Sequence, residues 1–244
     1  MKPLKMLGAC SLALLALSVV ASPTSAALPE FSKSGVCEQT GTLIWLYTNN
    51  TCTTDSATTT GEFAKSPFFS ESGASTLETV SGVQVTCTKA IDQGETTGPK
   101  AIAQLTVKFK GCSSGGHTCG SSGTITTNHL QGALGYINKT AKEVGLDLLA
   151  EATGGLLMEF NCEGGITNVH VRGSVIGKVT TVNTLTSSYL AAFTLTTKGK
   201  QNITKLEGGA EDVLETSKEG GAFEGSALET TDTIFPLAEI EIKA

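Results

Sequence analysis

The segment Ala103-Gln104-Leu105-Thr106-Val107-Lys108-Phe109-Lys110 alternates between apolar and polar residues without a break. Side chains of a β-strand point alternately to its two faces, so this pattern predicts a strand with one buried and one solvated face. The same alternation occurs in Val83-Gln84-Val85-Thr86-Cys87-Thr88. Turn-forming residues occupy 92–99 between the two segments, which indicates an antiparallel pair joined by a long loop.

Further segments of the chain show the pattern of short strands. They are 123–129, 156–162, 168–171, 175–182, 189–196, 202–206 and 222–229. The one segment that favours a helix is 131–143, where Gly132 and Gly135 weaken it. Many short strands with frequent turns predict an all-β fold, an antiparallel sandwich or barrel with at most one short helix.

The first 26 residues have the pattern of a secretory signal peptide. Lys2 and Lys5 precede an apolar stretch over 6–21, and small residues follow it up to Ala26. The apolar stretch is shorter than the ~20 residues that a membrane-spanning helix needs. The sequence therefore predicts cleavage after Ala26 and secretion to the cell exterior, without membrane insertion after the signal is removed.

The remaining chain is expected to contain three regions. They are an N-terminal disulfide-stapled hairpin region over 27–55, a linker-like segment over 56–78 and the main antiparallel β domain over 79–244.

The overall charge and the scarcity of aromatic residues limit the classes of partner. The formal net charge is −6 at pH 7, and Arg172 is the only arginine. Nucleic-acid binding depends on clustered basic side chains, so no nucleic-acid partner is expected. Aromatic residues make up only 5% of the chain, which weakens the case for a surface that stacks sugar rings.

The cysteine count is consistent with an oxidising compartment. Cys10 lies in the signal peptide, and the other six cysteines are predicted to form disulfides. The expected pairs are Cys37 with Cys52 around a hairpin, Cys112 with Cys119 across a small loop, and Cys87 with Cys162 between two core strands.

One motif matches the pattern of a catalytic serine. Gly111-Cys112-Ser113-Ser114-Gly115 fits G-x-S-x-G, in which a nucleophilic serine sits between a strand and a helix. The residues that follow are rich in glycine and serine and do not favour a helix. A loop held by a disulfide is therefore the expected role of this segment, and Ser113 is not predicted to be catalytic.

Two further groups of residues are candidates for chemistry. Cys112, His117 and Cys119 are types that bind zinc, with His129, His170 or Cys162 as a fourth ligand. Exported cysteines oxidise instead, so neither a metal nor another cofactor is predicted. Glycan hydrolysis uses two facing carboxylates, and the candidates are Glu143, Asp147, Glu151 and Glu159. Nothing in the sequence marks two of them as facing each other.

Several short blocks resemble a known group of proteins. They are Leu28-Pro29-Glu30-Phe31, Gly98-Pro99-Lys100, Phe109-Lys110-Gly111-Cys112 and Gly173-Ser174-Val175-Ile176-Gly177. Together they are similar to uncharacterised secreted β-rich proteins of actinobacterial genomes. The resemblance implies a location at a bacterial cell exterior and assigns no activity, ligand or catalytic residue.

The function predicted from these observations is that of an exported, non-catalytic binding module. Its ligand would be a cell-surface, matrix or small-molecule partner. Two alternatives remain open. One is a secreted hydrolase of glycans or esters, with a site built from residues far apart in sequence, and the other is a structural component of the envelope.

Overall fold

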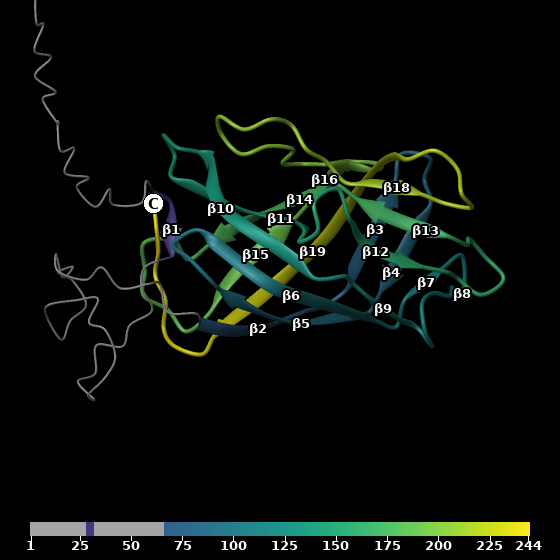
Figure 1. Ribbon diagram of the computed structural model, residues 1–244, viewed down its shortest axis with the longest axis horizontal. Helices are drawn as coiled ribbons and strands as arrows, with labels where there is room; N and C mark the ends of the chain where they lie inside the picture. Colours follow the sequence, from purple (N-terminus) through teal and green to yellow (C-terminus); the bar gives the residue numbers. More distant parts are fainter. Residues whose placement is uncertain (1–27, 32–65) are drawn as a thin grey trace, which may run out of the picture.

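The computed structural model describes residues 28–31 and 66–244, and its regular structure in these ranges is entirely β-strand (Figure 1). In chain order the strands are β1 (Glu30–Phe31), β2 (Ser66–Ser72), β3 (Ser75–Thr79), β4 (Gln84–Cys87), β5 (Lys89–Thr96), β6 (Ala101–Lys110), β7 (Ser113–Ser114), β8 (His117–Thr118), β9 (Thr124–Thr126), β10 (Leu130–Asn138), β11 (Glu143–Ala150), β12 (Leu156–Phe160), β13 (Val169–Arg172), β14 (Ser174–Thr180), β15 (Tyr189–Phe193), β16 (Leu195–Thr197), β17 (Lys200–Gln201), β18 (Glu215–Ser217), β19 (Glu224–Pro236) and β20 (Ile242–Lys243). The predicted all-β class is confirmed. No membrane-spanning helix occurs in the described ranges.

Eight of these strands close an antiparallel barrel. Their order is β15-β14-β11-β10-β6-β5-β2-β19, and β19 pairs back to β15. Every neighbouring pair around the ring is antiparallel. Of the two predicted architectures, the chain therefore forms the barrel.

Strand β19 also belongs to a second run of strands. Its later part, 230–236, pairs with β2 and β15 in the barrel, whereas its earlier part, 224–229, pairs with β3 and β18. The second run has the order β12-β13-β18-β19-β3-β4-β7-β8. Figure 1 shows β19 as the long yellow strand that passes from one group of strands to the other. The two groups thus share one backbone segment.

The alternating segment 103–110 forms most of β6, and its apolar side chains from Leu105 onward face inward. Gln104 has a φ of +55° and the register shifts beside it, so Ile102 is buried in place of Ala103. Leu105, Val107 and Phe109 are buried in the core. The expected pairing of this segment with 83–88 is wrong, because β6 pairs with β5, β9 and β10. Residues 89–96 form β5 instead of starting a loop, and Asp92 and Gly94 occupy inward positions where an apolar residue would have revealed the strand.

The helix favoured over 131–143 is absent, and a hairpin of β10 and β11 occupies this part of the chain. The two glycines that weakened the helix are positions of close packing. A Cβ atom on Gly132 would lie 2.8 Å from the Leu148 side chain, and one on Gly135 would lie 2.4 Å from the Leu206 side chain. These glycines therefore allow neighbouring side chains to approach the sheet.

One predicted region and one predicted strand differ from the structure. Residues 66–78 of the predicted linker-like segment lie in or between β2 and β3, which are integral to the two runs of strands. The segment has few apolar residues because β2 carries serines at inward positions, so its composition resembled a linker. Residues 202–206, predicted as a strand, lie in the connection between β17 and β18. The hairpin predicted between Cys37 and Cys52 lies outside the described residues. Of the region 27–55, the structure describes only residues 28–31, in which β1 pairs with β20.

Two disulfides lie at or next to the ends of strands in the second run. Cys87 is bonded to Cys112 and Cys119 is bonded to Cys162. These four cysteines are oxidised as predicted, but the expected pairs Cys112–Cys119 and Cys87–Cys162 are wrong. The predicted pair Cys37–Cys52 lies outside the described residues.

Strand pairing explains the change of partners. β4 pairs with β7 immediately beside Cys87 and Cys112, which places their Cα atoms 4.0 Å apart. Cys119 forms an isolated bridge with Cys162, and their Cα atoms are 3.9 Å apart. The expected pairing assumed that Cys87 and Cys162 lie near each other because each falls on the apolar side of an alternating segment. That pattern identifies a buried face of a strand but does not say which strand is its neighbour.

Candidate functional site

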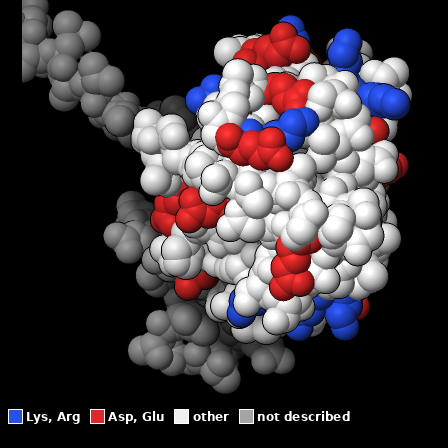
Figure 2. All heavy atoms as spheres, turned by 90° about the vertical axis from the view of Figure 1, so that its right-hand side faces the viewer, with Lys and Arg blue, Asp and Glu red and all other residues white. Residues whose placement is uncertain are grey.

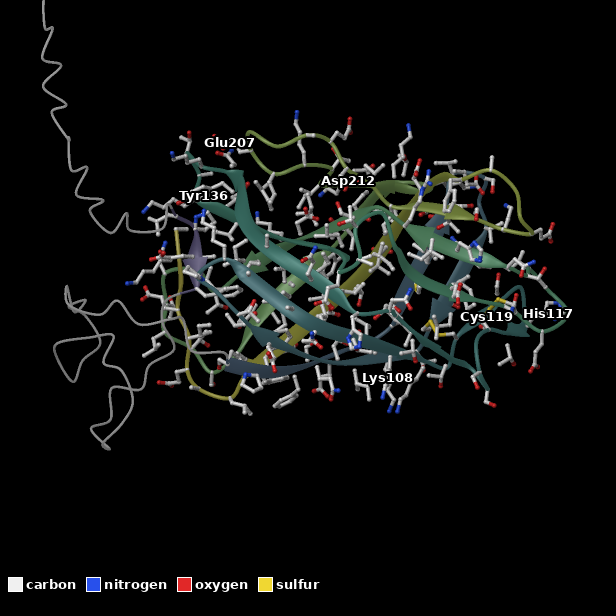
Figure 3. All side chains as sticks on the ribbon, viewed as in Figure 1. Lys108, His117, Cys119, Tyr136, Glu207 and Asp212 are labelled. Atoms are coloured by element: carbon white, nitrogen blue, oxygen red, sulfur yellow. A yellow bond between two sulfur atoms is a disulfide. The ribbon has the colours of Figure 1, made fainter. Side chains whose placement is uncertain are left out.

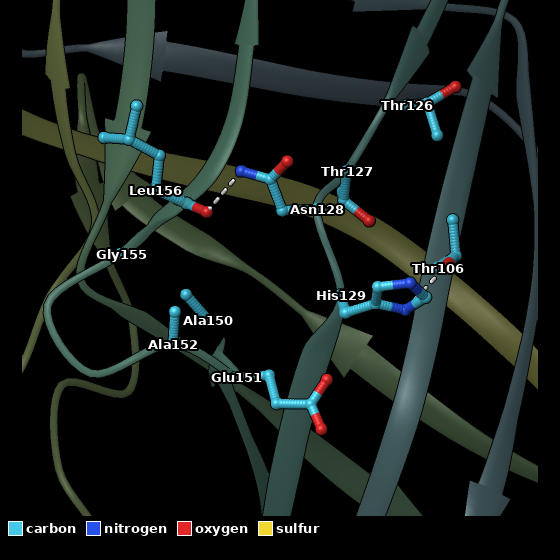
Figure 4. Close-up of a pocket in the computed structure, with 10 residues that line it drawn as sticks. All are labelled: Thr106, Thr126, Thr127, Asn128, His129, Ala150, Glu151, Ala152, Gly155 and Leu156. Atoms are coloured by element: carbon cyan, nitrogen blue, oxygen red, sulfur yellow. Dashed lines mark hydrogen bonds between the residues drawn. The ribbon is translucent and has the colours of Figure 1, made fainter.

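An open cleft with a volume of about 870 Å³ lies on the outer wall of the barrel (Figure 4). Its lining comes from β6, from the end of β9 and the segment that joins it to β10, and from the end of β11, the start of β12 and the connection between them. The residues are Thr106, Thr126, Thr127, Asn128, His129, Ala150, Glu151, Ala152, Gly155 and Leu156. The polar side chains among them carry hydroxyl, amide, imidazole or carboxylate groups.

The cleft forms where β6 changes its partner. β6 pairs with β9 at one end and with β10 further along, and residues 127–129 connect the two. The Thr127 hydroxyl accepts a hydrogen bond from the Val107 amide at 2.9 Å. The Asn128 amide nitrogen and side-chain nitrogen donate to the carbonyl oxygens of Leu157 and Leu156, both at 2.8 Å. These bonds fix the backbone of the cleft.

His129 and Glu151 face each other across neighbouring strands. Leu130 pairs with Ala150 in the ladder, and the Glu151 amide donates to the His129 carbonyl at 2.9 Å, which continues the ladder by one step. Directly opposed residues have Cβ atoms about 4.5–5.5 Å apart. Figure 4 shows both side chains projecting from this step into the same cleft.

The polar groups of this pair are largely unengaged. His129 Nδ1 lies 3.5 Å from Thr106 Oγ1, at the outer limit of a hydrogen bond. Within the described residues, the Glu151 carboxylate has no hydrogen bond or ion pair. Thr106, His129 and Glu151 therefore do not form a hydrogen-bonded catalytic triad, and their polar atoms remain available to a ligand.

The structure separates the four acidic residues proposed for glycan hydrolysis. Glu143 pairs with Lys178 at 2.5 Å, and Glu159 lies 3.9 Å from His170 Nε2. Asp147 lies on the outer face of β11 beneath a long loop, and Glu151 alone lines the cleft. No two of these carboxylates are brought together.

The serine and zinc candidates lie at one end of the molecule, where Figure 3 labels His117 and Cys119. Ser113 begins the short hairpin of β7 and β8, and no helix follows it. Cys112 and Cys119 are oxidised and cannot act as thiolate ligands. Across residues 28–31 and 66–244, no group of three His, Cys, Asp or Glu side chains is arranged to hold a metal ion.

Two aspartates that sequence reasoning did not identify face the barrel interior. Asp92 comes from β5 and Asp232 from β19, on either side of β2. The Ser70 hydroxyl donates to Asp92 Oδ2, while the buried Asp92 Oδ1 has no partner. Thr230 Oγ1 lies 3.3 Å from Asp232 Oδ1. No local signal in the sequence marks them, because Asp92 and Gly94 take the inward positions of β5 and remove its apolar alternation.

Burial and mutual repulsion favour the protonated form of this pair. Burial, followed by the charge of Asp232, raises the pKa of Asp92 to about 7, although the hydrogen bond from Ser70 lowers it. Burial likewise raises the pKa of Asp232 to about 6, against the lowering effect of nearby hydroxyls. An interior cavity of about 40 Å³ borders Asp232, which is room for a few water molecules. Apart from this small cavity, buried apolar side chains fill the barrel interior.

The outer surface has a mixed charge. On the end of the molecule shown in Figure 2, basic and acidic side chains lie interspersed among neutral ones. The lining of the cleft contains one carboxylate and no lysine or arginine.

No protein-family model, curated protein or solved structure matches this chain.

Proposed function

We propose that the protein is an exported, non-catalytic binding module and that its ligand occupies the cleft beside His129 and Glu151. The observation that carries this proposal is the cross-strand pair itself, whose side chains enter one open cleft with the Glu151 carboxylate unpaired. Two disulfides support an extracellular location, because such bonds persist in oxidising compartments.

The lining favours an uncharged ligand rich in hydroxyl groups. Threonine hydroxyls, the asparagine amide and imidazole can donate and accept hydrogen bonds, as sugar hydroxyls do. An anion would find no lysine or arginine in the lining and would meet the Glu151 carboxylate. Ala150, Ala152 and Leu156 offer small apolar surfaces to the C–H groups of a sugar. A glycan segment of a cell surface fits this chemistry, with modest affinity because no phenylalanine, tyrosine or tryptophan lines the cleft.

Glu151→Gln is expected to weaken glycan binding about tenfold. The substitution keeps the shape of the side chain but removes the charge, and a hydrogen bond to a charged group contributes about 1.5–3 kcal/mol. Isothermal titration calorimetry with neutral hexasaccharides of glucose, xylose and N-acetylglucosamine measures the change.

Glu159→Gln serves as the matched control, because Glu159 is an exposed glutamate on β12 outside the cleft. This variant should bind as the wild type does. Absence of binding to every hexasaccharide, or equal losses in both variants, would contradict a glycan site in the cleft.

One observation favours the hydrolase alternative, namely the contact of Thr106 Oγ1 with His129 Nδ1. In that case His129 would act as a general base within the cleft. The same hexasaccharides, together with nitrophenyl esters, distinguish the two functions by product analysis. Turnover that His129→Ala abolishes would replace the binding proposal, whereas binding without products supports it.

A further inference from the structure

The barrel wall carries a row of paired residues that begins in the cleft. Thr106 of β6 lines the cleft and pairs with Gln93 of β5. Gln93 is also opposite Phe69 of β2, and Phe69 is opposite Phe235 of β19. Figure 1 shows β2, β5 and β6 next to one another along one side of the barrel. Directly opposed residues of an antiparallel sheet project from the same face, so these four side chains form one outer row.

Burial shows that the outer row faces solvent. Phe69 and Gln93 are exposed, whereas their chain neighbours Ser70 and Asp92 are buried inside the barrel. Neighbouring strands lie about 4.8 Å apart, so the row extends roughly 10 Å from Thr106 to Phe69. A ligand that fills the cleft and continues along the wall would therefore cross β5 and reach β2.

The far end of the outer row is an aromatic pair. The rings of Phe69 and Phe235 are stacked, with their centroids 5.0 Å apart and an angle of 17° between their planes. Phe69 is nevertheless 51% exposed, so the stacking orders its ring while leaving much of it open to solvent. Ile91, which is 39% exposed, lies on the same face of β5 and diagonally opposite Phe69. Apolar side chains that cluster on one exposed face, unlike scattered ones, mark an interaction surface.

The order of chemical groups along the outer row suits a linear chain of neutral sugars. Thr106 and Gln93 can donate and accept hydrogen bonds, as sugar hydroxyls do. The exposed ring of Phe69 offers a flat apolar surface to the C–H face of a sugar ring. None of the four residues is charged. An extended peptide fits less well, because β2, β5 and β6 are each paired on both sides and offer no free edge to an added strand.

We infer that the glycan bound in the cleft continues along the outer row and that one of its sugar rings packs on Phe69. The inference rests on the proposed function, because the row begins at a residue of the cleft. It adds an aromatic contact outside a cleft that has no phenylalanine, tyrosine or tryptophan in its lining. The ligand is then an extended glycan, and a chain long enough to reach Phe69 binds more tightly than one that fills the cleft alone.

The test compares disaccharides with hexasaccharides of glucose, xylose and N-acetylglucosamine in isothermal titration calorimetry of the full chain. A disaccharide is short enough to stay in the cleft, whereas a hexasaccharide reaches β2. Phe69→Ala should weaken hexasaccharide binding about fivefold, which is the size of a single aromatic contact, and should leave disaccharide binding unchanged. Phe69→Tyr keeps the ring and should bind both ligands as the wild type does. Because Phe69 is exposed, neither substitution disturbs the core.

Phe223→Ala is the matched control, because the Phe223 ring lies under the Arg172 guanidinium, outside the cleft and the outer row. It should bind both ligands as the wild type does. Unchanged hexasaccharide binding in Phe69→Ala, together with the loss expected in Glu151→Gln, would overturn this inference and leave the proposed function intact. Absence of binding to every glycan would overturn both. A dimer in sedimentation velocity that Phe69→Ala dissociates would assign the aromatic pair to a contact between two copies, which also overturns the inference.

Discussion

Replacing both Cys119 and Cys162 by serine is expected to lower the free energy of unfolding by about 4 kcal/mol. The bond joins residues separated by 43 positions, so it removes much of the chain entropy of the unfolded state. Both cysteines are almost fully buried, at 0% and 1% exposure, so the serine hydroxyls would also be placed in the core. Urea denaturation followed by circular dichroism measures the change.

The second disulfide supplies the matched control. Cys87 and Cys112 are separated by only 25 positions, so replacing this pair should cost less, by about 0.5 kcal/mol on loop entropy alone. Peptide mapping without reduction should find both bonds as described. A Cys119–Cys162 double variant as stable as the wild type, or a mapped Cys112–Cys119 bond, would contradict these pairings.

Asp92→Asn is expected to raise the free energy of unfolding at pH 8 by about 4 kcal/mol. Burial and the charge of Asp232 raise the pKa of Asp92 from 3.8 to about 7, and raising a pKa by one corresponds to about 1.4 kcal/mol against the charged form. An asparagine has nearly the same shape and never ionises, so the variant avoids this cost. Its side-chain oxygen can still accept the Ser70 hydroxyl.

The contribution of the Asp92–Asp232 pair to the free energy of unfolding decreases as the pH rises. Because the pKa in the folded state lies above that in the unfolded state, the folded state binds the proton more tightly. The contribution of this pair to stability is therefore complete below about pH 4 and is lost as the pH rises through 6 to 7. Thermal unfolding from pH 5 to pH 8 should show Tm falling in the wild type.

Variants of the two interior aspartates and of an exposed carboxylate separate the titration of the Asp92–Asp232 pair from the effect of removing any negative charge. Asp92→Asn should flatten the pH profile, and Asp232→Asn should do so as well, because each substitution removes one member of the pair. Glu211→Gln removes an exposed carboxylate elsewhere and should leave the slope unchanged. A wild-type Tm that rises between pH 5 and pH 8, with an unaltered slope in both interior variants, would show that the pair does not titrate in this range.

Local alternation predicted the all-β class because burial on one face imposes a period of two on the sequence. That rule succeeded for β6, whose inward residues are apolar. It failed for β5 and β2, whose inward positions include Asp92 and Ser70. A polar residue facing a barrel interior has the sequence signature of a turn, so this part of the fold could not be recognised locally.

The candidate site depends on contacts between strands, which a single sequence does not encode in an obvious pattern. His129 and Glu151 are 22 positions apart and meet only through the register of β10 and β11. The sequence pattern singles out each residue separately, one as a zinc ligand and the other as an acid. The disulfide partners were missed for the same reason. Alternation predicts which face of a strand a cysteine occupies, but it does not predict which cysteine lies opposite on the neighbouring strand.

The sharing of β19 by both groups of strands has a consequence for the order of folding. Asp232 in this strand pairs with Ser72, 160 positions earlier in the chain. Neither the barrel nor the second run of strands can close until β19 has been synthesised. Pairing over such long sequence separations makes folding slow, and the chain therefore stays open until nearly all of it has emerged from the ribosome. Late closure would suit the proposed export, in which the chain passes unfolded through a channel.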